Sequence, residues 1–269
     1  MTIDAVEHFW DHNVANWKIA AHLEPGSAEF FAEVERYRFD KLNYLPKVVD
    51  YTTYAGKDIL DIGCGLATDL SRFAKGGANT TGIDISGQAI QLAEQNFAQR
   101  GLVGKFNQMN GELLDFADNQ FDFIYCHTVL HFTPNPQKMV AEIQRVLKPG
   151  GKALLMTINR NSWLYFLHRV VGLKIDYMDA PVFHKFNYAE FKALCADFAQ
   201  CELMVERFPV RTEVHKGWKA MIYNRLFVDI YNALPSFLVG KTGYHLLAFV
   251  ENSLEGDLEH NPENTVEKE

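Results

Sequence analysis

The sequence predicts an α/β protein built on a seven-stranded, doubly wound sheet. Between Lys57 and Ile158, short apolar runs alternate with amphipathic helical patterns, which is typical of successive strand–helix–strand units in a parallel sheet. The first apolar run ends in Gly63-Cys64-Gly65, a turn that suits the passage from a strand into a helix. Two further apolar runs near the end of the chain supply strands that close one edge of the sheet.

Five strands and three helices are expected in this central region. The expected strands are 58–62, 79–85, 106–109, 121–126 and 152–158. The expected helices run from Leu66 to the stop at Gly76-Gly77, from the N-cap Ser86 to Gly101, and from Pro136 to Leu147. The run 121–126 is apolar without interruption, so we expect it to be buried on both faces of the sheet. Pro149-Gly150-Gly151 forms the expected turn into the fifth strand.

The flanking segments complete the predicted domain organisation. Residues 1–56 are expected to form a helical lid in which Ser27, after Pro25-Gly26, is a helix N-cap. Residues 57–250 are expected to form the core, interrupted at about 209–242 by an apolar and mostly helical insert. The later core elements are a helix over 187–198 and strands over 202–208 and 244–250. Residues 251–269 hold seven acids against one lysine and are expected to form an acidic tail.

Charge and composition limit the partners and the compartment. Hydrophobic residues make up 48% of the chain and charged residues 22%, values that exclude a disordered or coiled-coil protein. The net charge is −8, and no cluster of Lys and Arg is available for a phosphate backbone, so nucleic acid is not an expected partner. The four cysteines lack disulfide or metal-site spacing, which predicts reduced thiols and no bound metal.

The chain also lacks the sequence features of export and of membrane insertion. Its first residues show no signal-peptide pattern, and no run reaches the ~18 uncharged apolar residues of a membrane span. We therefore expect a cytoplasmic protein without stable membrane insertion. The sequence leaves the oligomeric state open.

Two acids near the ends of neighbouring strands predict a nucleoside-binding site. Asp61 lies just before the glycine turn, and Asp84 follows Gly63 by 21 residues, where a carboxylate accepts both ribose hydroxyls. Dinucleotide sites place a third glycine where this chain has Thr68. An acid at the turn would also repel a pyrophosphate, whereas it suits a ligand with an ammonium group and a cationic centre. These features favour S-adenosylmethionine over NAD, and the alternative is a purely structural turn with a surface acid.

Four segments of the central region together resemble the class I S-adenosylmethionine-dependent methyltransferases. They are ILDIGCGLATDL (59–70), GIDIS (82–86), NGELLDFADNQFDFIYCHTVLHF (110–132) and EIQRVLKPGGKALL (142–155). The resemblance is greatest to the small-molecule branch that includes the ubiquinone and menaquinone methyltransferases. It implies a Rossmann-like sheet with an S-adenosylmethionine cofactor. It also implies methyl transfer to an O, N or C atom of a small metabolite, and the aromatic residues considered below favour an apolar or aromatic one.

The resemblance also implies roles for individual residues. It places Asp61, Gly63, Cys64 and Gly65 along the methionine portion, Asp84 and Ile85 at the ribose, Asn110, Gly111 and Glu112 beside the adenine, Cys126 and His127 near the sulfonium, and Arg38 at the methionine carboxylate. The family usually has Asp at the position of Asn110, and an amide still accepts a hydrogen bond from the adenine amino group. For Arg36 and Arg38, a solvated helix face is an equal alternative.

The residues around the acceptor are less firmly indicated. His131 follows the fourth strand by one helical turn and is the expected general base, with simple packing at a helix start as the alternative. Polar and aromatic candidates are expected in the segment that covers the acceptor, namely Asn159, Arg160, Trp163, Tyr177, His184, Tyr188 and His215. Together with Trp10, Trp17 and Trp218 they predict a pocket with aromatic walls, which suits an apolar or aromatic acceptor. The alternative for most of these residues is packing of the insert onto the sheet. Two other functions stay open, a nicotinamide-dependent oxidoreductase and a non-catalytic S-adenosylmethionine-binding partner protein.

Overall fold

The computed structural model describes residues 2–14, 17–172, 175–210 and 221–254. In these ranges, seven strands form one sheet in the order β3-β2-β1-β4-β5-β7-β6. The strands are β1 (Asp58–Ile62), β2 (Asn79–Asp84), β3 (Lys105–Gln108), β4 (Phe121–His127), β5 (Leu147–Ile158), β6 (Gln200–Glu206) and β7 (His245–Glu251). The first five pair with one another in parallel, and β7 lies antiparallel between β5 and β6. The predicted seven-stranded, doubly wound sheet is confirmed.

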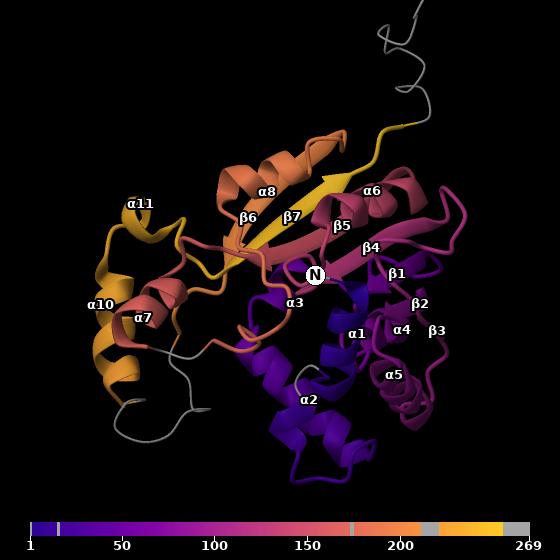
Figure 1. The fold of residues 1–269 in the computed structure, drawn as a ribbon, viewed down its shortest axis with the longest axis horizontal. Helices are drawn as coiled ribbons and strands as arrows, with labels where there is room; N and C mark the ends of the chain where they lie inside the picture. The colour runs from indigo at the N-terminus through magenta and orange to yellow at the C-terminus, as the bar shows by residue number, and fades with distance from the viewer. Residues whose placement is uncertain (1, 15–16, 173–174, 211–220, 255–269) are drawn as a thin grey trace, which may run out of the picture.

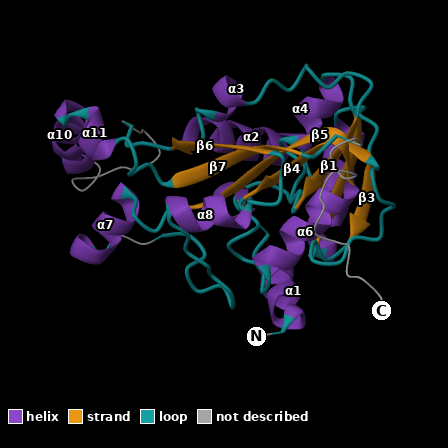
Figure 2. Ribbon diagram, turned by 90° about the horizontal axis from the view of Figure 1, so that it is seen from above, coloured by secondary structure: helices purple, strands orange, loops and turns teal. Residues whose placement is uncertain are grey.

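Helices cover both faces of the sheet, with α3 and α4 on one side and α6 and α8 on the other (Figure 2). The helices before β4 are α1 (Ile3–His12), the short η1 (Trp17–Ala20), α2 (Ala28–Lys41), α3 (Leu45–Val48), α4 (Leu70–Lys75) and α5 (Gly87–Gln99). The helices after β4 are α6 (Pro136–Val146), α7 (Trp163–Val171), α8 (Tyr188–Leu194), the π-helical η2 (Tyr223–Phe227), α10 (Val228–Ala233) and α11 (Ser236–Val239). In Figure 1, α7, α10 and α11 lie together at one end of the molecule.

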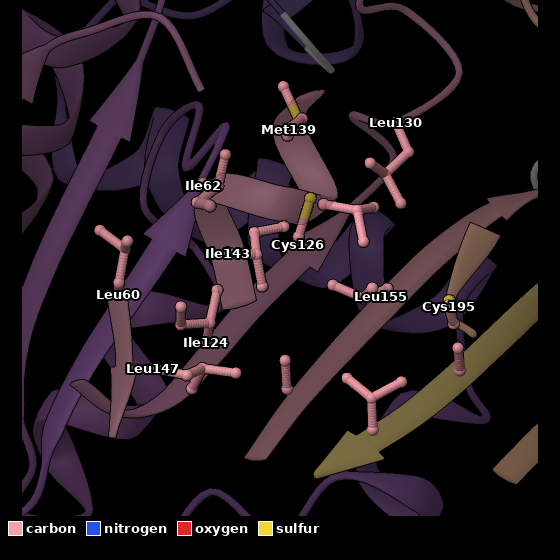
Figure 3. Packing of buried hydrophobic residues seen from close by; sticks show 14 of the residues in the cluster. Leu60, Ile62, Ile124, Cys126, Leu130, Met139, Ile143, Leu147, Leu155 and Cys195 are labelled. Carbon is pink, nitrogen blue, oxygen red and sulfur yellow. The ribbon is translucent and has the colours of Figure 1, made fainter. Parts of the chain in front are cut away.

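The central strands are buried on both faces. Leu60 belongs to a core cluster with Ile143 of α6 (Figure 3), whereas its neighbour Ile59 belongs to a second cluster with Phe73 of α4. Successive side chains of a strand point to opposite faces, so each of the two helical layers buries its own half of the strand residues. This double burial explains the continuous apolar run over 121–126, which the structure contains in β4.

Three elements begin at least two residues away from their predicted starts. They are the helix after β1, the fifth strand, and β6, which the sequence predicts over 202–208 and which begins at Gln200. The helix expected from Leu66 begins at Leu70, because the preceding turn holds Gly63, Gly65 and Ala67 at φ values of 70°, 53° and 53°, which no α-helix contains. The fifth strand begins at Leu147 rather than at 152, and its register against β4 shifts at that end. The expected turn at 149–151 is thus part of an irregular strand start.

The functional edge of the sheet lies at the carboxyl ends of the parallel strands. Because β7 is antiparallel, its first residue lies at the same edge. There, His245 pairs in register with Ile158 at the end of β5 and with Glu206 at the end of β6. Ligands of open α/β sheets bind at this edge.

Candidate active site

A cavity of about 1420 Å³ opens along this edge. Its lining includes Gly63 after β1, Asp84 at the end of β2, Thr128 after β4, Ile158 at the end of β5 and His245 at the start of β7. Side chains of α1, α2, α7, η2 and α10 complete the walls. Sites for one drug-sized molecule span roughly 300–1,000 Å³, so this cavity has room for a cofactor and a second molecule.

The glycine turn after β1 requires glycine at its first position. Gly63 has a φ of 70°, and a Cβ atom there would lie 2.2 Å from the Cγ2 atom of Val129. Gly65 also has a positive φ, of 53°, but a Cβ atom there would meet nothing within 4 Å. Both glycines line the cavity. The turn therefore exposes backbone atoms, not side chains, to a ligand. Val129 packs closely against Gly63, whereas the space next to Gly65 is empty.

Asp84 lies in the cavity lining with its carboxylate fixed by backbone groups. It accepts hydrogen bonds from the amide of Gly65 at 2.9 Å and from the amide of Ser86 at 3.0 Å. Burial raises the pKa of Asp84, although these amide donors oppose the shift. The contact with Gly65 joins the end of β2 to the glycine turn after β1, as the spacing of the two motifs predicts. Ile85 also lines the cavity, next in the chain.

Three acids, Asp61, Asp69 and Asp84, lie close enough together at this end of the cavity to affect the ionisation of Asp61. Asp61 in β1 is buried beside the cavity rather than in its lining. Burial raises the pKa of Asp61 well above its usual range, and the charges of Asp69 and Asp84 raise it further. Arg38 opposes this shift. The two predicted acids thus lie in the same electrostatic environment at neighbouring strand ends.

Arg38 and Arg36 differ sharply in environment. Arg36 is 72% exposed and pairs with Glu33 on the surface of α2. Arg38 is only 13% exposed, lines the cavity, and forms an ion pair with Asp69, which also accepts a hydrogen bond from the Tyr51 hydroxyl at 3.1 Å. Burial disfavours the charged guanidinium, yet the Asp69 carboxylate prevails and raises the pKa of Arg38. The pair ties α2 to the segment between β1 and α4.

A buried hydrogen-bond network next to Arg38 was not indicated by the sequence. The Tyr44 hydroxyl lies 3.0 Å from Nε2 of His127 and 2.6 Å from Nδ1 of His245. Arg38 lies 3.4 Å from the other ring nitrogen of His127, and Arg207 lies 3.2 Å from the other ring nitrogen of His245. Burial lowers the pKa of both histidines well below the usual range, so both imidazoles are neutral. Tyr44 and His245 are 201 positions apart, and no local pattern could have linked them.

His131 is a buried imidazole in the wall of the cavity. It is 1% exposed, and its Nδ1 atom has no hydrogen-bond partner within the described ranges. Burial, together with the nearby His184, lowers the pKa of His131 to about 3. The backbone amide of His184 donates to the His131 carbonyl at 2.7 Å. The side chain is therefore neutral, and its Nδ1 atom is buried without a hydrogen-bond partner among the described residues.

Only some of the other predicted cofactor residues lie in the cavity lining. Asn110 and Gly111 line the cavity, whereas Glu112 accepts hydrogen bonds from the Thr133 hydroxyl and the Asn135 amide at the start of α6. Cys126 is a buried thiol in the core cluster of α6 (Figure 3). The predicted cofactor residues that are buried outside the cavity lining are Asp61, Cys64, Glu112, Cys126 and His127. Their assigned roles near the cofactor stay predictions.

The predicted aromatic wall is present only in part. The cavity lining includes Trp10, Trp163 and Tyr177. The polar candidates Asn159, Arg160, His184 and Tyr188, together with Trp17, lie outside it. Asn159 donates to the carbonyls of Lys241 and Gly243, so its amide holds the chain before β7 in place. His215 and Trp218 lie outside the described residues.

The sheet order and the cavity at its carboxyl edge define a class of protein. Residues 60–155 match the family model described as a methyltransferase domain. This match and the fold agree with the class I S-adenosylmethionine-dependent methyltransferases that the sequence motifs resemble.

The chain is also similar in sequence to two O-methyltransferases of ubiquinone biosynthesis. The chain is 34% identical over 151 residues to a ubiquinone biosynthesis O-methyltransferase of Coxiella burnetii, covering 56% of this chain and 62% of the relative. It is 36% identical over 119 residues to the protein of the same name from Pseudomonas aeruginosa, covering 44% of this chain and 51% of the relative. The chain therefore spans about half to 62% of the length of these relatives.

Solved structures share the fold at low identity. One from Methanosarcina mazei, titled a SAM-dependent methyltransferase, is 24% identical with a TM-score of 0.55, covering 78% of this chain and 98% of that one. Another from Thermotoga maritima, titled a possible histamine N-methyltransferase, is 18% identical with a TM-score of 0.58, covering 91% of this chain and 99% of that one. A cyclase matches equally well, with a TM-score of 0.58. The fold alone thus leaves the reaction to be argued from the site.

Proposed function

We propose that this protein transfers the methyl group of S-adenosylmethionine to an oxygen atom of a small, apolar or aromatic acceptor. The two relatives described above are named O-methyltransferases, which favours oxygen over nitrogen or carbon as the methyl acceptor atom. The observation that carries the proposal is one cavity that joins the glycine turn and Asp84 to the neutral imidazole of His131.

The residues of the cavity fit this cofactor. Gly65 leaves open space above bare backbone, and the buried Asp84 carboxylate is positioned to accept ribose hydroxyls. Asn110 and Gly111 would hold the adenine. The acids Asp61 and Asp69 lie where negative potential would favour a ligand with an ammonium group. When bound, S-adenosylmethionine supplies a methyl group activated by the positive charge on its sulfur.

His131 is suited to hold the acceptor and to receive its proton. The neutral imidazole can accept a hydrogen bond from a hydroxyl and so orient its oxygen. A hydroxyl proton becomes far more acidic as the oxygen forms its new bond to carbon, so even a weak base can then take it. Side chains of α1 and α2 wall the cavity and exclude water from this step.

Replacing Asp84 by alanine is expected to weaken the binding of S-adenosylhomocysteine by about 10- to 100-fold. A hydrogen bond to a charged group contributes roughly 1.5–3 kcal/mol, and every 1.4 kcal/mol is about tenfold in affinity. The measurement is isothermal titration calorimetry. Asp58→Ala is a matched control, because Asp58 lies at the opposite end of β1 and is half exposed. Unchanged affinity in Asp84→Ala would disprove the placement of the ribose.

The binding of S-adenosylhomocysteine is expected to weaken as the pH falls. Burial raises the pKa of Asp61 well above its usual range, so in the free protein its carboxyl group takes up a proton at a higher pH than an exposed aspartate does. The ammonium group of the ligand favours the ionised carboxylate, so binding must release that proton and becomes weaker at low pH. Asp61→Asn should bind more weakly at high pH and respond less to pH. A parent protein whose affinity does not change with pH contradicts this role.

A direct comparison of ligands tests the function as a whole. S-adenosylhomocysteine is expected to raise the melting temperature, because a ligand that binds the native state stabilises it, whereas NAD is expected to leave the melting temperature unchanged. Transfer of labelled methyl from S-adenosylmethionine to a phenolic acceptor would then demonstrate the reaction. Stabilisation by NAD alone would instead support the oxidoreductase, and cofactor binding without turnover on any acceptor would support the non-catalytic alternative.

A further inference from the structure

Arg207 occupies a site in the cavity to which neither the sequence motifs nor the proposed cofactor assigns a role. It follows the last residue of β6, Glu206, which pairs in register with His245. This register places Arg207 at the carboxyl edge of the sheet, and the residue lines the cavity. Arg207 therefore places a positive charge at the same edge of the sheet as Asp84. The two residues follow strands near opposite ends of the sheet order, β6 and β2.

The guanidinium of Arg207 is held in place from several sides. It lies 3.2 Å from Nε2 of His245 and stacks over the Tyr244 ring at 4.7 Å from the centroid. Its backbone has a φ of 59°, and its carbonyl accepts a hydrogen bond from the Trp163 indole at 2.9 Å. A non-glycine residue with positive φ is uncommon and is often found at functional sites. Only one of the five N–H donors of the guanidinium is used by His245.

Within the described ranges, no carboxylate pairs with Arg207, in contrast to the other cations of the cavity lining. Arg38 is paired with Asp69, and the Lys41 ammonium lies 2.8 Å from Asp176. Half-buried charges in an apolar wall are normally paired or hydrogen-bonded, because desolvation of an unmatched charge is costly. Arg207 therefore presents a positive charge that a ligand anion can neutralise.

An apolar stripe lies in the same cavity. Ile222 lies directly before η2, Leu226 lies in η2 and Ile230 lies in α10. They follow one another at intervals of four, so they share one helical face. All three line the cavity, yet they are 46%, 57% and 56% exposed. Leu164 and Leu167 of α7 also line it. An apolar ligand that covered these side chains would remove their exposed area from water, at about 25 cal/mol per Å².

We infer that the methyl acceptor is an apolar carboxylic acid, whose carboxylate pairs with Arg207 and whose apolar body lies along Ile222, Leu226 and Ile230. This inference rests on the proposed function of the cavity. A carboxylate matches the planar guanidinium through two parallel hydrogen bonds. A phosphate group carries more charge and would call for a second unpaired cation, which the described lining does not offer.

Two probes with the same apolar body, one carrying a carboxylate and the other an uncharged hydroxyl group, test the inference. They are para-pentylbenzoate and the uncharged para-pentylbenzyl alcohol, each titrated calorimetrically into protein saturated with S-adenosylhomocysteine. The parent protein is expected to bind the acid about tenfold or more tighter than the alcohol. Arg207→Gln is expected to abolish this preference, and Arg207→Lys to retain part of it. Arg169→Gln is the matched control, because Arg169 lies on α7, is exposed, and is outside the cavity lining.

The outcomes separate this inference from the proposed function. Equal affinity for the two probes in the parent, or a full preference for the acid in Arg207→Gln, overturns the inference. Binding of S-adenosylhomocysteine is expected to be the same in all variants, which also shows that each one is folded. Absence of that binding in the parent contradicts the proposed function, whereas a preference for the acid that disappears in Arg207→Gln supports the carboxylate site in either case.

Discussion

Replacing His131 by alanine is expected to lower kcat by about 10²- to 10⁴-fold, the usual contribution of a positioned general base. The affinity for S-adenosylhomocysteine should change by less than about twofold, a negligible difference in binding free energy. The side chain is buried in the cavity wall with Nδ1 unpartnered in the described ranges, so the variant loses a proton acceptor and little else. Steady-state kinetics with an identified acceptor, together with calorimetry, would measure both quantities.

The pH dependence of kcat gives an independent check on His131. Because burial lowers the pKa of His131 to about 3, the imidazole stays neutral between about pH 5 and about pH 8. The parent kcat should therefore show no inflection from this group in that range. His131→Gln keeps a hydrogen-bonding side chain but no basic nitrogen, so it should bind acceptor nearly as well and turn over as slowly as the alanine variant. Full turnover in either variant would remove His131 from the mechanism.

Most of the sheet could be predicted because its signals are local. The run from Asp58 to Ile62, the stop at Gly63, and the N-cap Ser86, whose hydroxyl accepts from the Ala89 amide, all depend on residues within a few positions. The start of α4 could not be predicted in the same way. Apolar spacing from Leu66 suits a helix, but the left-handed backbone at Ala67 is imposed by the turn that carries the site. Tertiary context there overrides local propensity.

The candidate site was predictable where it lies on one short segment and unpredictable where it joins distant ones. Asp84 and Gly65 were linked by motif spacing, and the structure joins them by a hydrogen bond. Tyr44 and Arg207 have no motif, because their contacts to the histidines arise only when β7 inserts between β5 and β6. Arg38 could be singled out by resemblance, but whether it was solvated or buried depended on how α2 docks.

Breaking the ion pair between Arg38 and Asp69 is expected to have the largest effect on stability. Arg38→Ala leaves the Asp69 carboxylate buried, with a hydrogen bond from the Tyr51 hydroxyl in place of its ion pair. Removing one partner of a buried pair costs about 3–5 kcal/mol, because the remaining charge is desolvated without compensation. For a chain of this size, the melting temperature should fall by roughly 10 °C. Thermal unfolding followed by circular dichroism would measure the change.

A double-mutant cycle distinguishes this electrostatic cause from a loss of packing. Asp69→Asn removes the charge that Arg38→Ala leaves unpaired, so the double variant should be more stable than Arg38→Ala alone. If instead the two losses simply add, the guanidinium stabilises the fold through its contacts and not through its charge. Arg36→Ala is the control on the same helix, since an exposed ion pair contributes about 0–1 kcal/mol. A melting temperature of Arg38→Ala equal to that of Arg36→Ala would show that the pair does not hold α2 against the site.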